Sequence, residues 1–183
     1  MSYSLSVNIA AESYTGPDVG IYSVDKLVSQ ARRLAVEYRK ATGQPLGISA
    51  EIAKQDAVRL LDLELCQRGE GGYDAVGLSG RLKGKRIQIK GRAIFDESKS
   101  GQRIGQLKLE QPWDSVVLLI MDENFEPAEI YEADREEIIE ALKPGGPNKR
   151  GAMSVAKFKI IGRIAWTRGE GPLEDEVWTN REE

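Results

Sequence analysis

Two segments near the start of the chain place apolar residues at helical spacing. The first can be capped by Ser23 and stopped by Gly43, which predicts a helix between them. The second begins near Ser49 and continues to about Cys66, before a glycine-rich break at 69–72. The two apolar stripes are Leu27, Ala31, Leu34, Ala35 and Tyr38, and then Ala53, Ala57, Leu60 and Leu61. We therefore predict two amphipathic helices, each of which buries one face.

Strand patterns follow these helices. Five segments have strand character: 73–78, 85–94, 114–121, 128–131 and 163–167. Residues 81–84 suit a hairpin turn between the first two strands, and the polar segment 95–105 suits a loop. The most apolar segment is 114–121, which predicts a central strand that is buried on both faces.

Two shorter helices complete the pattern. One is predicted at 134–142, where it opens with a capping-box sequence, and the other at 154–161. This order of elements predicts an α/β or α+β fold with a central mixed sheet flanked by helices. We expect a single domain at 23–168, preceded by an N-terminal arm at 1–22 and followed by an acidic, flexible tail at 169–183.

The bulk composition is that of an ordinary globular protein. The 183 residues are 40% apolar and 30% charged, which is enough for one domain with its own core. No apolar run approaches the roughly 20 residues of a membrane helix, and the N-terminus does not resemble a signal peptide. Cys66 is the single cysteine, so no internal disulfide can form. We expect a cytoplasmic protein that does not bind a membrane.

The absence of histidine restricts the possible chemistry. Serine–histidine and cysteine–histidine pairs are excluded, and so are most zinc sites. Catalysis in this chain must use carboxylates, lysine, tyrosine, hydroxyl groups, or a hard metal ion held by oxygen atoms.

Charge is unevenly distributed along the sequence. Residues 81–108 contain nine Lys/Arg against two acids, and residues 143–168 contain seven with no acid. Residues 110–140 contain eleven acids and one arginine, and residues 170–183 contain six acids and one arginine. The two basic blocks can form one face for a polyanion, or they can be ordinary solvated surface.

The candidate chemistry lies in the first two predicted strands. Gln88 and Lys90 share one face of the second strand, because strand side chains alternate. With Lys83 near the tip of the hairpin, Asp74 is expected opposite residues 91–92 and close to Lys90. One carboxylate, one amide oxygen and one ammonium would then meet, which suits Mg²⁺ binding and charge stabilisation on a phosphate. Each of the three residues also has a plainer explanation, as part of a turn or of a solvated strand.

Asp74, a short hairpin and then Gln88-x-Lys90 resemble the signature of the PD-(D/E)xK nuclease superfamily, which has the restriction-endonuclease-like fold. The Gln-Ile-Lys form is similar to the Mrr-like branch, where glutamine takes the acid position. The resemblance covers about 49–121 and implies a DNA endonuclease that uses Mg²⁺ or Mn²⁺. It implies that Asp74, Gln88 and Lys90 are catalytic. Asp74 and Gln88 would hold the metal together with Glu51, whose place in the first turn of a helix is otherwise explained by the helix dipole.

Basic residues near this motif are candidates for phosphate contacts: Arg92, Lys83, Lys85, Arg103 and Lys108. Nucleic acid, with DNA favoured, is the expected partner, and a homodimer would allow both strands to be cut. Two alternatives stay open. The same fold can bind nucleic acid with little or no cleavage, which the missing acid at position 88 favours. A protein-interaction or immunity-type domain is suggested by the acidic block at 110–140.

Overall fold

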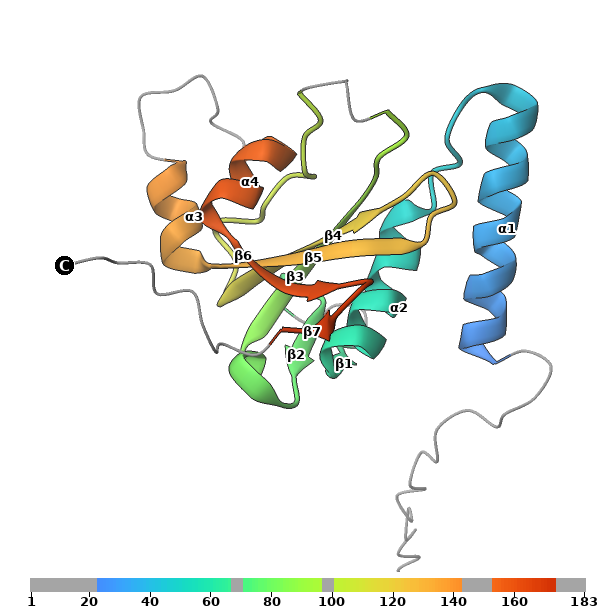
Figure 1. The fold of residues 1–183 in the computed structure, drawn as a ribbon. Coiled ribbons are helices and arrows are strands. Elements are labelled where there is room, and N and C mark those ends of the chain that lie inside the picture. Colours follow the sequence, from blue (N-terminus) through green and yellow to red (C-terminus); the bar gives the residue numbers. More distant parts are fainter. Residues whose placement is uncertain (1–22, 67–70, 97–100, 143–152, 174–183) are drawn as a thin grey trace, which may run out of the picture.

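Helices and strands follow one another in nearly the predicted order (Figure 1). The computed structural model describes residues 23–66, 71–96, 101–142 and 153–173. Its helices are α1 (Val24–Thr42), α2 (Ser49–Leu61), α3 (Arg135–Ala141) and α4 (Val155–Ile161). Its strands are β1 (Leu63–Leu65), β2 (Ala75–Gly77), β3 (Arg86–Ala93), β4 (Ser115–Met121), β5 (Pro127–Asp134), β6 (Arg163–Thr167) and β7 (Gly171–Pro172). A 3-10 turn, η1 (Gly80–Leu82), connects β2 to β3.

The ends of the first two helices are fixed by local signals. The Ser23 side chain accepts a hydrogen bond from the backbone of Lys26, and Gly43 ends α1 with a left-handed φ of 71°. Both ends of α1 were predicted. The prediction that α2 continues to about Cys66 is wrong, because Asp62 adopts a left-handed φ of 52° and β1 follows at once. Leucine alternates with acidic residues from 61 to 65, which is a strand pattern. The predicted helix had included these residues.

The seven strands form one mixed sheet in the order β1-β2-β3-β4-β5-β6-β7. All neighbours are antiparallel except β3 and β4, which run parallel. The predicted α+β class with a mixed sheet is confirmed. Strand β7 lies within the segment assigned to the tail and pairs with β6, whereas the arm and residues 174–183 lie outside the described residues.

Each face of the sheet carries its own core. On one face α1 and α2 cover the side chains of Ile87, Ile89 and Val117, and Figure 1 shows α3 and α4 on the opposite face. There, Phe158 of α4 and Ile138 of α3 pack against alternate residues of β4. All residues of β4 are buried, so its predicted central place is confirmed.

Where the structure describes it, the connection between the parallel strands β3 and β4 contains no helix. Crossovers between parallel strands are usually helical. Here the connecting segment is irregular where the structure describes it, and it buries Ile104, Leu107 and Trp113 in the core on the α3–α4 face. This packing fixes residues 104–109 over one face of β3.

Strand β3 is paired along only half of one edge. Its described contacts with β2 are Ala75 with Ile87 and Val76 with Arg86. Within the described residues, positions 88–93 have no strand neighbour on that side. Among the described residues this stretch of backbone therefore has no strand partner on that edge, although the Asp74 side chain accepts from the backbone N of Ile89. It lies between α2 on one face and the 104–109 segment on the other. Among the described residues, no helix combines the length and apolar character needed to cross a membrane.

Candidate functional site

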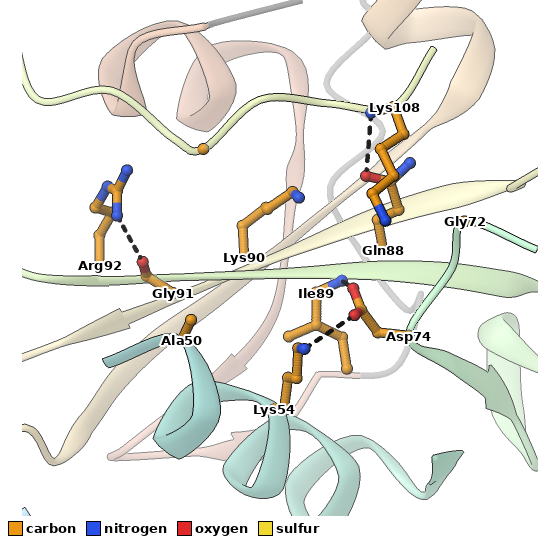
Figure 2. Close-up of a pocket in the computed structure, with 11 residues that line it drawn as sticks. Ala50, Lys54, Gly72, Asp74, Gln88, Ile89, Lys90, Gly91, Arg92 and Lys108 are labelled. Carbon is orange, nitrogen blue, oxygen red and sulfur yellow. Dashed lines mark hydrogen bonds and ion pairs between the residues drawn. The ribbon is translucent and has the colours of Figure 1, made fainter. Parts of the chain in front are cut away.

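A pocket of about 290 Å³ lies at this open edge of β3 (Figure 2). Ala50 and Lys54 come from α2, and Gly105 and Lys108 come from the crossover. The remaining lining residues are Gly72, Asp74, Gln88, Ile89, Lys90, Gly91 and Arg92. The predicted triad of Asp74, Gln88 and Lys90 is thus brought into a single pocket.

Asp74 lies just before β2 and extends the hydrogen bonding between β2 and β3 by one residue. Its backbone N donates to the carbonyl of Ile87 at 2.7 Å, and its Oδ2 accepts from the backbone N of Ile89 at 2.8 Å. The predicted register is wrong. Asp74 lies one step beyond the Ala75–Ile87 pair, level with Gln88 and not with residues 91–92. The reason is that the 3-10 turn Gly80–Leu82 reverses the chain earlier than a hairpin centred on Lys83 would.

Gln88 is buried, with 1% of its surface exposed. Its Oε1 accepts a long hydrogen bond of 3.4 Å from the backbone N of Lys108. Its Nε2 is buried and has no hydrogen-bond partner within the part of the chain that the structure describes. An unpaired buried donor of this kind costs about 1–3 kcal/mol, so a ligand oxygen at this position would be stabilised by the amide.

Lys90 points into the pocket from the same side of β3 as Gln88 (Figure 2). None of the described residues forms a hydrogen bond or an ion pair with its ammonium. Burial lowers the pKa of Lys90 below its ordinary value. The Asp74 carboxylate opposes this shift, whereas three nearby cations add to it: Lys108, Lys54 and Arg92.

Lys54 was not anticipated by the sequence analysis. It reaches from α2 beneath β3, and its Nζ lies 3.2 Å from Oδ1 of Asp74 (Figure 2). The same Nζ lies 3.6 Å from Oε1 of Glu51, one helical turn earlier. Burial opposes the positive charge, but the two carboxylates outweigh that effect and raise the pKa of Lys54. The i,i+3 spacing of Glu51 and Lys54 was visible in the sequence, but the contact with Asp74 depends on the fold.

Glu51, predicted as a metal ligand, does not line the pocket itself. Its side chain is 71% exposed, and it reaches the site through Lys54. The Lys54 ammonium therefore occupies a place where a cation meets two carboxylates. The amide oxygen of Gln88 is a third oxygen at the same pocket. Within the described residues no three acid, cysteine or histidine side chains gather as a metal-binding group. Asp74 and Glu51 can thus both contact one divalent ion only at the position that the ammonium now takes.

The predicted phosphate-binding residues separate into two groups. Arg92 and Lys108 line the pocket, whereas Lys83, Lys85 and Arg103 do not. The side chain of Arg92 donates to the backbone carbonyl of Arg103, and this contact ties β3 to the crossover.

Lys85 belongs to an ion-pair network at the other end of β3. Its Nζ lies 2.7 Å from Asp134 and 3.1 Å from Glu132, which is 2% exposed and also pairs with Arg163 at 3.1 Å. A phosphate-binding role for Lys85 is therefore not supported. The same pairs explain why β5 continues to Asp134, beyond the predicted end at 131, because they neutralise Glu132 inside the sheet.

Where the structure describes them, acids and bases of the charge blocks pair with one another. Acids of the 110–140 block pair with bases of the 143–168 block: Glu129 with Lys159, Asp122 with Arg168, and Glu132 and Asp134 with Arg163. These bases do not extend the cationic pocket, and these acids do not form a free acidic surface. Among the described residues, four cations and one carboxylate, Asp74, line the pocket, so its charge is mostly positive.

No protein-family model matches this chain, and a search of curated proteins finds no match to it.

Proposed function

We propose that the chain is a metal-dependent endodeoxyribonuclease with a restriction-endonuclease-like core. The observation that carries this proposal is the meeting of Asp74, Gln88 and Lys90 in one cationic pocket on the open edge of β3. The arrangement of α2 before an antiparallel β1–β2–β3 unit, with β4 parallel to β3, supports the same assignment. The cytoplasm is the expected location.

The pocket suits a phosphodiester because its charge is mostly positive and its donors point inward. Lys108 and Arg92 flank the open strand edge and can hold the non-bridging oxygens of one or two phosphates. The unpaired Nε2 of Gln88 can donate to a further oxygen. These contacts act on the backbone of the nucleic acid, so they predict binding that weakens steeply with salt.

Lys90 is the residue best placed to act in hydrolysis. Water attacks the phosphorus and forms a new O–P bond, while the P–O bond to one sugar breaks. The released sugar oxygen takes a proton from solvent. In its neutral form the Nζ of Lys90 can take the proton of the attacking water, and in its charged form it stabilises the phosphate oxygens. Asp74, Gln88 and Glu51 would hold a divalent ion, which supplies a polarised phosphoryl oxygen and a more acidic water.

The first test is cleavage of supercoiled plasmid with Mg²⁺, Mn²⁺ or EDTA. We expect metal-dependent nicking or linearisation by the native chain and a loss of about 10²–10⁴-fold in Lys90→Ala. Asp74→Ala should also lose activity. Lys40→Ala is the matched control, because Lys40 is an exposed lysine on α1 that pairs only with Glu37 among the described residues. Absence of cleavage with both metals, or full activity in Lys90→Ala, would refute the proposal.

A nucleic-acid-binding module without cleavage is the second candidate. It is favoured by the single lining carboxylate, whose charge Lys54 already balances. Salt-sensitive DNA binding that is unchanged by EDTA, with no cleavage in either metal, would select it. The protein-interaction alternative has less support, because several acids of the 110–140 block form ion pairs within the fold, among them Asp114, Asp122 and Glu129.

A further inference from the structure

The ammonium of Lys54 lies between the two carboxylates that are the candidate anionic ligands of the metal. Its Nζ is 3.2 Å from Asp74 and 3.6 Å from Glu51. The side chain is 29% exposed, so it is neither locked in the core nor free in solvent. A cation that is to contact both acids must enter this same place.

We propose that Lys54 is a built-in competitor of the divalent ion, which binds only after the ammonium has left Asp74 and Glu51. The proposal rests on the proposed function, because it assumes that these acids are where a metal binds. Two cations cannot share the carboxylate oxygens at such distances, since their repulsion in a partly buried site is large. Binding of the ion therefore includes breaking of two ion pairs.

The Lys54 side chain can move to another part of the pocket when a metal ion displaces it. Its ammonium sits on a flexible four-carbon stem, and Lys54 already lines the pocket beside Lys90 and Lys108. Released from Asp74, it adds a positive charge to the surface that faces a phosphate. Without metal, the same ammonium neutralises the carboxylate that continues the edge of β3 and so holds α2 against Asp74.

Direct measurement of Mn²⁺ binding by calorimetry tests the competition. In Lys54→Met, which keeps an unbranched side chain that is one atom shorter and removes the charge, we expect Mn²⁺ to bind at least about tenfold more tightly than in the native chain. Lys40→Met is the control, because Lys40 also forms an i,i+3 pair with a glutamate on a helix, at 3.0 Å from Glu37. It should leave the affinity unchanged. Adding Asp74→Asn to Lys54→Met should abolish the gain.

The competing outcomes separate this proposal from the nuclease assignment. Equal or weaker Mn²⁺ binding in folded Lys54→Met, or no binding in either protein, overturns the competition whatever the plasmid assay shows. Tighter Mn²⁺ binding in Lys54→Met supports the competition even where plasmid is not cleaved. In that case only the nuclease assignment is refuted. Circular dichroism and a melting curve establish that each variant is folded.

Discussion

Replacing Gly91 with alanine will push helix α2 away from strand β3. A Cβ built on Gly91 would lie 2.3 Å from the Cβ of Ala53 and 3.0 Å from the backbone oxygen of Ser49, both on α2. Carbon atoms in ordinary contact are about 3.5–4.0 Å apart, so the helix must move by about 1 Å or more. The absence of a side chain at position 91 is therefore what lets α2 lie so close to the strand.

The cost can be estimated from overpacking of buried contacts. Extra atoms in a well-packed core typically destabilise a protein by about 1–3 kcal/mol. For a chain of this size each kcal/mol lowers the melting temperature by roughly 2–4 °C, so we expect a fall of about 2–12 °C. Plasmid cleavage should fall as well, because α2 carries Glu51 and β3 carries Lys90, and the movement separates these two residues of the proposed site.

Thermal unfolding followed by circular dichroism provides the assay, and Gly47→Ala is the matched control. Gly47 lies just before α2, and a Cβ there would meet nothing within 4 Å. Gly47→Ala should melt at or slightly above the native temperature. Ala53→Gly added to Gly91→Ala should recover part of the loss, which a double-mutant cycle would register as coupling. A Gly91→Ala protein that melts with the native chain would refute the close-packing argument.

Two further predictions concern stability. Lys85→Met removes a partner of the buried Glu132, so it should destabilise the fold by about 1–3 kcal/mol in urea titrations. It should leave DNA affinity unchanged, and weaker DNA binding at full stability would contradict this. Hydrogen bonds with Arg86 lower the pKa of Asp114 to about 2. The Asp114 carboxylate therefore stabilises the fold fully above its unfolded pKa of about 4, and this stabilisation is lost as the pH falls towards 2. Asp114→Asn should therefore melt below the native protein at pH 7 and approach it near pH 2; a gap that does not narrow would contradict the assigned role.

The sequence was sufficient where the signals are local. Capping by Ser23 and Gly43, the capping box of α3 and the apolar run of β4 each depend on neighbouring residues, and each was predicted. Alternation along β3 also placed Gln88 and Lys90 on one face. These features need no knowledge of what lies across the sheet.

Features that depend on distant contacts were missed. The register of Asp74 follows from a 3-10 turn that the sequence did not reveal, although the carboxylate still reaches the pocket. Lys54 was missed because its partner Asp74 lies twenty residues further along the chain, beyond β1. Lys85 was assigned to phosphate because its acidic partners, Glu132 and Asp134, lie more than forty residues further along.

The half-paired edge of β3 also bears on how the protein avoids self-association. Unpaired strand backbone is a template onto which another molecule can add a strand, and natural proteins protect such edges with charge. Lys90 and Arg92 place like charges along this stretch in every copy, so two such edges repel each other. A variant that loses both charges is therefore expected to aggregate through this edge more readily than the native chain.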